Sequence, residues 1–178
     1  MRKIPTSLDG VFVIEPHVHE DARGMFLEGW NDAVFRREVC DVGFVQDNHS
    51  LSYRNVVRGL HWQWGVGKLV RVVNGSIWDV AVDVRRDSAT FGKWFGTQLN
   101  SENHRMMWIP DGFAYGFKVV SEVADVCYKV TGYWQSCDEV TVKWDDPDIG
   151  IDWGLDGDAI VSDRDFKARA LKEVIWRA

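Results

Sequence analysis

Short apolar runs separated by turn residues dominate the middle of this chain. Between residues 44 and 144 the runs are rich in valine and aromatic side chains, and glycine, asparagine and aspartate interrupt them at short intervals. Such runs are typical of β-strands, and their close spacing favours an antiparallel barrel or a two-sheet sandwich. The predicted strands are residues 44–52, 56–64, 68–73, 76–85, 94–100, 105–110, 113–120, 124–134 and 139–144.

The flanking segments predict one further strand and two helices. Residues 10–16 alternate loosely between apolar and polar positions, which indicates a strand. Residues 30–39 show helical spacing, and Asn31 or Asp32 is a suitable first residue. Residues 163–176 also show helical spacing. The apolar positions of this last segment are Phe166, Ala170, Leu171 and Val174. We therefore expect a mainly β protein with a few short helices, including one at the C-terminal end.

Composition and charge exclude several classes of partner. The chain has 178 residues and no repeat or linker, so residues 1–178 are expected to form a single domain. A net charge of −6 argues against a nucleic-acid partner, because phosphate binding needs a basic surface. No apolar run approaches the length of a membrane span, and the first residues lack a signal peptide's apolar core. Cys40, Cys127 and Cys137 fit reduced thiols. We expect a cytoplasmic protein that does not bind membranes.

Residues 58–71 combine a histidine, a lysine and two arginines with several glycines. A two-residue turn at positions 65–66, with glycine first, predicts a hairpin of the type II′ class. In that hairpin His61, Gln63 and Lys68 share one face. A base and a cation placed together could remove a proton beside a carbonyl and hold the oxyanion that forms. The alternative is an edge hairpin with solvated charges.

Residues 109–117 contain the Pro-x-Gly turn of a cupin-type jelly-roll barrel. Metal-binding cupins carry a histidine ligand where this chain has Tyr115. The other histidine pair, His17 and His19, lies far upstream without a carboxylate at the usual spacing. We therefore expect no metal site, and we interpret the pair as surface residues.

Several short motifs occur in the order and spacing of one enzyme family. They are IEP (14–16), DARG (21–24) with Phe26 and Glu28, FVQDN (44–48), VRGLH (57–61), GKLVR (67–71), DVAVD (79–83), TFG (90–92), IPDGFA (109–114) and YK (128–129). Through these motifs the chain resembles the dTDP-4-dehydrorhamnose 3,5-epimerase family over residues 10–171.

The resemblance implies a homodimeric jelly roll that uses neither metal nor cofactor. Members of the family invert C3 and C5 of dTDP-4-keto-6-deoxy-D-glucose, a step toward dTDP-L-rhamnose and surface polysaccharide. The chemistry agrees, since a C4 ketone acidifies the protons on both neighbouring carbons. Inversion also needs an acid on the opposite face of the ring, and a neutral tyrosine suits that role.

The resemblance assigns four catalytic residues. His61 matches the base, Lys68 the cation near the C4 oxygen and Tyr128 the opposite-face acid. Asp165 matches the aspartate that orients the histidine. Two simpler interpretations stay open, because Tyr128 could be a core tyrosine and Asp165 could belong to a Ser-x-x-Asp helix cap. Asp163 is an outside candidate for the aspartate.

The resemblance also assigns a nucleotide site. Arg23 and Arg58 match arginines that contact the diphosphate, and Gln46 and Asn48 match polar residues of the same cleft. The remaining matches are Phe26, Tyr133 and Trp134 around the thymine ring, Glu28, and Tyr115 in the sugar pocket. In the family, the segment equivalent to residues 23–28 reaches across from the partner subunit. Core burial is the alternative for Phe26 and Trp134.

Three departures from the family pattern lie close to the substrate. The loop at residues 65–67 is short and carries Val66, Tyr115 replaces a histidine, and Trp134 replaces a tyrosine. A single-centre epimerase, an enzyme for another 4-keto nucleotide sugar, and a catalytically silent sugar-nucleotide-binding cupin are therefore the alternatives.

Overall fold

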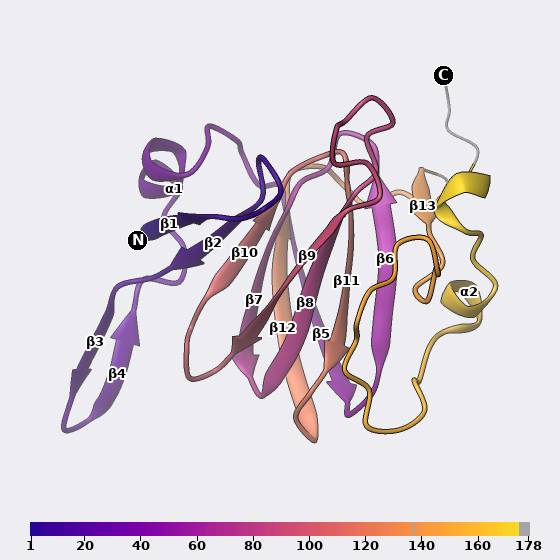
Figure 1. Cartoon of the computed structure of the whole chain (residues 1–178). Coiled ribbons are helices and arrows are strands. Elements are labelled where there is room, and N and C mark those ends of the chain that lie inside the picture. Colours follow the sequence, from indigo (N-terminus) through magenta and orange to yellow (C-terminus); the bar gives the residue numbers. More distant parts are fainter. Residues whose placement is uncertain (137, 175–178) are drawn as a thin grey trace.

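Two antiparallel β-sheets packed face to face form the body of the molecule (Figure 1). The computed structural model describes residues 1–136 and 138–174. The first sheet has the strand order β1 (Arg2–Pro5), β2 (Phe12–Glu15), β10 (Met106–Ile109), β7 (Lys68–Asn74), β12 (Val123–Val130) and β5 (Gln46–Tyr53). The second has the order β13 (Glu139–Thr141), β6 (Val57–Gln63), β11 (Phe113–Val119), β8 (Ser76–Asp83) and β9 (Trp94–Asn100). The mainly β, jelly-roll prediction is confirmed.

A separate two-stranded hairpin projects from the body (Figure 1). It consists of β3 (Val18–Asp21) and β4 (Gly24–Leu27). The chain then forms α1 (Asp32–Glu38), whose N-cap Asn31 accepts a hydrogen bond from the Val34 backbone N–H. The helix predicted over residues 30–39 is therefore confirmed, and it begins after an ordinary side-chain cap.

Apolar side chains alternate along the strands, and this alternation fills the space between the sheets. Val70 and Val126 come from the six-stranded sheet, and Ile77, Ala81 and Phe117 come from the five-stranded sheet. Burial of this set provides the main driving force for stacking the sheets. A second apolar cluster covers the outer face of the five-stranded sheet with side chains from the C-terminal third of the chain.

The predicted hairpin around residues 65–66 is wrong. β6 pairs with β11 and β13, whereas β7 pairs with β10 and β12, so the two strands lie in opposite sheets. Pairing on both edges satisfies more backbone groups than one local hairpin can, and it also buries Val66. His61 and Lys68 consequently face each other across the sandwich instead of sharing one face of a hairpin.

The helix predicted over residues 163–176 is also wrong in its extent. The structure has a one-turn helix α2 (Asp163–Phe166) and a 3₁₀ turn η1 (Leu171–Glu173), and residues 175–176 lie outside the described part. Between them the backbone binds other elements: the Lys143 N–H donates to the Arg169 carbonyl, and the Leu171 N–H donates to the Asp146 carboxylate. These tertiary hydrogen bonds replace those of a continuous helix.

Two further expectations concern cysteines and membranes. Cys40 and Cys127 are free thiols, and Cys137 lies outside the described residues. Among the described helices, none has both the length and the apolar character that a bilayer crossing requires.

Candidate active site

A histidine and an aspartate from distant parts of the sequence meet at the side of the five-stranded sheet. His61 lies on β6, and its Nε2 is 2.6 Å from Oδ1 of Asp165 on α2. The Asp165 side chain is 4% exposed and that of His61 is 24% exposed. Burial by itself raises the pKa of Asp165, but the hydrogen bond and charge of His61 bring it below its ordinary value. The pair is a histidine–carboxylate dyad.

Local structure explains how Asp165 reaches the histidine. Ser162 is the N-cap of α2, and its hydroxyl accepts a hydrogen bond from the Asp165 backbone N–H at 3.1 Å. The Asp165 carboxylate stays free to bind His61 and, at 3.4 Å, the Gly59 backbone N–H. The helix cap and the dyad thus coexist. The Asp163 side chain is 98% exposed, so the outside candidate is wrong.

Glycine at position 59 allows β6 to pass close to β11. Gly59 has a φ of +136°, which L side chains rarely adopt, and a Cβ there would lie 2.6 Å from the Gly116 Cα. The Arg-Gly-Leu-His motif therefore has a structural requirement immediately before the histidine. The same backbone segment presents its N–H to Asp165.

Lys68 approaches His61 from the opposite sheet. Its Nζ donates to the His61 carbonyl oxygen at 3.3 Å and lies 5.1 Å from the centre of the Tyr115 ring. Burial lowers the pKa of Lys68 to about 8, although nearby Glu139 and Asp79 act in the opposite direction. Lys68 is therefore a cation at neutral pH that loses its charge just above it.

Tyr128 belongs to β12, beside the strand of Lys68, and is partly buried. Its ring centre lies 6.4 Å from that of Tyr115. Burial and the charge of Glu139 raise its pKa, while Arg58 lowers it. The phenol consequently keeps its proton at neutral pH and can donate it. Because β12 and β6 belong to facing sheets, Tyr128 and His61 come from opposite walls of the molecule.

A cleft of about 300 Å³ opens beside Lys68 and Tyr128. Its lining residues are Gln46, Asn48, Gln63, Val66, Lys68, Tyr128, Val130, Gly132, Trp134 and Glu139. Gln46 donates to the Asn48 side chain and accepts from the Trp134 backbone N–H, so these three predicted residues form one wall. Arg58 is exposed and donates to Ser52, and its charge reaches both Tyr115 and Tyr128.

Tyr115 is the buried neighbour of this cleft. It pairs with His61 across β11 and β6 and is almost fully covered. Tyr133, by contrast, is exposed, and its carbonyl accepts a hydrogen bond from Gln63. The loop with Tyr133 and Trp134 is thereby attached to β6. Core burial, the alternative for Trp134, is wrong, because this residue is more than half exposed.

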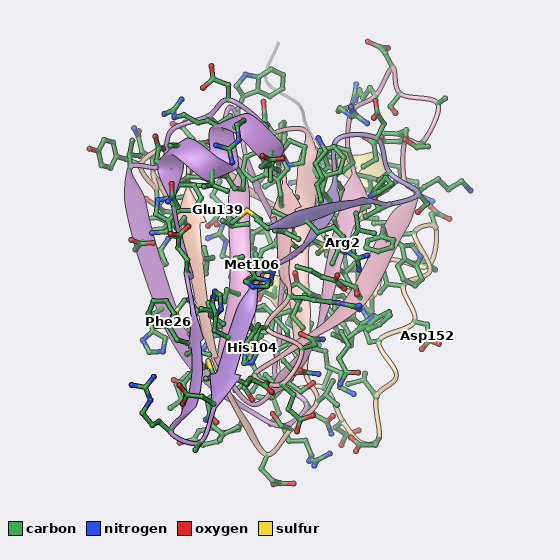
Figure 2. The ribbon with its side chains drawn as sticks, turned by 90° about the vertical axis from the view of Figure 1, so that its left-hand side faces the viewer. Arg2, Phe26, His104, Met106, Glu139 and Asp152 are labelled. Atoms are coloured by element: carbon green, nitrogen blue, oxygen red, sulfur yellow. The ribbon has the colours of Figure 1, made fainter. Side chains whose placement is uncertain are left out.

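Three predicted residues do not line the cleft of their own chain. Arg23 forms an ion pair with Asp21, and Phe26 is 71% exposed on β4 (Figure 2). Glu28 follows the same strand. These residues lie on or next to the projecting hairpin, away from β6 and α2, which carry the dyad (Figure 1). Core burial of Phe26 is therefore wrong.

Comparison with known proteins decides the family. A model of the dTDP-4-dehydrorhamnose 3,5-epimerase family matches residues 5–173. The chain belongs to this family. The dTDP-4-dehydrorhamnose 3,5-epimerase of Methanothermobacter thermautotrophicus is 49% identical over 97% of this chain and 95% of the relative. The Pseudomonas aeruginosa protein of the same name is 46% identical over 97% of each chain.

A solved structure extends the likeness from sequence to fold. The crystal structure of dTDP-6-deoxy-D-glucose-3,5-epimerase from Legionella pneumophila, in complex with dTDP-4-keto-L-rhamnose, matches with a TM-score of 0.95 and 41% identity. The match covers 98% of this chain and 94% of that chain. This member of the dTDP-4-dehydrorhamnose 3,5-epimerase family thus shares the fold of the Legionella pneumophila epimerase.

Sequence reasoning missed Glu139 as a cleft residue of this epimerase-family chain. The side chain of Glu139 on β13 forms an ion pair with Arg164, the neighbour of Asp165 (Figure 2 labels Glu139). Glu139 alternates with Val140 and Val142, which pack outside the sheet, so strand alternation turns Glu139 inward. The alternation does not indicate that this strand borders a cleft. Gln63 was expected near the histidine, but its hydrogen bond to the Tyr133 carbonyl was not predicted.

Proposed function

We propose that this protein converts dTDP-4-dehydro-6-deoxy-D-glucose to dTDP-4-dehydro-L-rhamnose by epimerisation at C3 and C5, without metal or cofactor. The observation that carries this proposal is the arrangement of the His61–Asp165 dyad, Lys68 and Tyr128 around one end of the sandwich. The family membership and the named activities of its relatives support the same substrate.

The proposed chemistry starts with removal of a proton next to the C4 ketone. Asp165 lies against Nε2 of His61, so the other ring nitrogen, Nδ1, is the one that accepts the substrate proton. The buried carboxylate stabilises the imidazolium that results. The Lys68 ammonium stabilises the negative charge that develops on the C4 oxygen.

Inversion requires that the proton return to the opposite face of the sugar ring. Tyr128 stands on the sheet that faces His61 and remains protonated at neutral pH, so it can supply that proton. The same ketone acidifies C3 and C5. One base, one acid and one cation can therefore serve both centres, provided that the sugar turns between the two steps.

Deuterium incorporation tests this proposal directly. We expect dTDP-4-dehydro-6-deoxyglucose incubated with the protein in D₂O and a chelator, with no cofactor added, to gain deuterium at both C3 and C5 and to yield the L-lyxo product by NMR. Label at one carbon alone would identify a single-centre epimerase. Val66 and Trp134, which line the cleft, would then be the candidate residues for restricting the reaction to one carbon. Binding of dTDP without label would identify a silent binding protein.

We further propose that two copies of the chain form a dimer in which each hairpin completes the partner's site. Met25 and Phe26 are exposed on the projecting hairpin, so this arm has apolar surface to bury. An additional hollow of about 390 Å³ lies on the outer face of the six-stranded sheet. Its apolar lining includes Trp30, Leu69 and Val73. Exposed apolar surface of this kind is typical of protein contacts.

Mixing two inactive variants tests the shared site. His61→Asn damages the base, and Arg23→Ala damages the hairpin. Random exchange of subunits should restore about one quarter of the wild-type sites, because half of the dimers are mixed and each has one intact site. Sedimentation should show a dimer for each parent. Activity that stays at the level of the parents would mean that each hairpin serves its own chain.

A further inference from the structure

A buried carboxylate without a well-formed hydrogen bond lies inside the sandwich beneath Lys68. Asp79 on β8 is 0% exposed, and in the described part of the chain neither of its side-chain oxygens has a hydrogen-bond partner. The Tyr115 hydroxyl is also buried and without a well-formed bond. Buried polar groups are normally satisfied, so this cluster needs an explanation.

The strands bring the three groups together from both sheets. β8 and β11 are neighbours, and their register places Asp79 diagonally from Tyr115 on the inward face, between the core residues Ile77 and Ala81. β7, which carries Lys68, lies in the facing sheet (Figure 1). Its Nζ lies 5.1 Å from the Tyr115 ring centre, and the Tyr115 hydroxyl faces the Asp79 carboxylate.

The charges around Lys68 show what this cluster can do. Burial raises the pKa of Asp79 well above its ordinary value, and the Tyr115 hydroxyl and the Lys68 charge both act to lower it. Asp79 in turn favours the charged form of Lys68. The titratable and charged groups that face Lys68 or these partners are Asp79 on β8, Tyr115 on β11, Glu139 on β13, Tyr128 on β12, and His61 and Arg58 on β6.

We propose that Asp79 and Tyr115 are positioning residues that keep Lys68 cationic and in place at the floor of the cleft. The Asp79 carboxylate supplies a negative charge on the side of Lys68 away from the cleft. The Tyr115 hydroxyl donates toward that carboxylate and opposes the rise of its pKa on burial, and the Tyr115 ring supports the ammonium. This inference rests on the proposed role of Lys68 as the cation that binds the C4 oxygen.

The role follows from the cost of burying a lone ammonium. A lysine buried without a counter-charge releases its proton at a lower pH than an exposed lysine does. The neutral amine that results does not stabilise an enolate. A histidine at position 115 would also carry an N–H that can donate to Asp79, so it should serve the same purpose as the Tyr115 hydroxyl.

Direct titration of Lys68 tests the proposal without relying on turnover. The probe is the NMR signal of ¹³Cε-labelled lysine, assigned with Lys68→Met. The wild-type midpoint is expected at about 8. Asp79→Asn should lower it by about 1 pH unit or more, the scale of one lost opposite charge. Tyr115→Phe should lower it less, and Tyr115→His should retain the wild-type midpoint.

Asp83→Asn is the matched control, because Asp83 is equally buried on the same strand but binds Arg85, Ser88 and Thr90 instead. It should leave the Lys68 midpoint unchanged.

In the wild-type protein, exchange at the sugar carbons should fall as pH rises through the Lys68 pKa, because the cation is lost. Asp79→Asn should move that fall to lower pH.

An unchanged Lys68 midpoint in Asp79→Asn would overturn the proposal. If that variant does not fold, Tyr115→Phe decides, since it removes one hydroxyl and no charge, and an unchanged midpoint there has the same meaning. A protein that shows the expected titration but no exchange of substrate protons would instead contradict the proposed function and leave the positioning inference standing.

Discussion

Replacement of His61 by asparagine should reduce proton exchange at both C3 and C5 by about 10³-fold or more, the upper range for loss of a general base. Asparagine fills a similar space and keeps a polar side chain, but it cannot accept a proton at neutral pH. Exchange is measured by NMR in D₂O, and calorimetric titration with dTDP should show affinity within a few-fold of wild type. Exchange at near wild-type rate would contradict the assignment of the base.

The Asp165→Asn variant distinguishes the role of Asp165 in the dyad from its role in the helix cap. The carboxylate is buried against the His61 ring, so its loss removes the charge that stabilises the imidazolium, and we expect a rate loss of about 10²- to 10⁴-fold. Ser162→Ala is the matched control because it removes the cap and leaves the carboxylate. It should cost about 1 kcal/mol of unfolding free energy with little effect on rate. Equal rate losses in both variants would indicate a structural role alone.

Tyr128→Phe should uncouple proton exchange from inversion. His61 and Lys68 remain, so deuterium from the solvent still enters the substrate on the face from which the proton was removed. Delivery from the opposite face loses its acid, and formation of the L-lyxo product should fall by about 10²- to 10⁴-fold. One NMR experiment that follows both label and configuration measures the two effects.

Tyr53→Phe serves as the control for that variant, since Tyr53 is an exposed tyrosine at the far end of β5 from Gln46. It should change neither label nor configuration. Because the pKa of Tyr128 is raised above that of an ordinary tyrosine, its proton should be lost only at strongly alkaline pH. A loss of the wild-type rate near pH 8 should therefore result from deprotonation of Lys68. Equal losses of exchange and inversion in Tyr128→Phe would contradict the acid role.

Part of the active site could be predicted without coordinates. The family resemblance assigned His61, Lys68, Tyr128 and Asp165, and the structure brings all four to one end of the sandwich. Glu139 escaped prediction because a carboxylate on a short strand is most often solvated, and no local pattern says that its strand will border a cleft. Tyr115 was recognised as unusual, but its contact with Asp79 joins two strands distant in sequence.

What the sequence by itself determined is the local structure. Short apolar runs bounded by turn residues indicated the strands from β5 onward, and Asn31 indicated the start of α1, because both signals act between residues close in the chain. Tertiary structure decided which strands pair. The turn at residues 65–66 is compatible with a hairpin, yet β6 and β7 obtain more buried surface and more backbone hydrogen bonds from distant partners in opposite sheets. That crossing, which no local signal encodes, is what places Lys68 opposite His61.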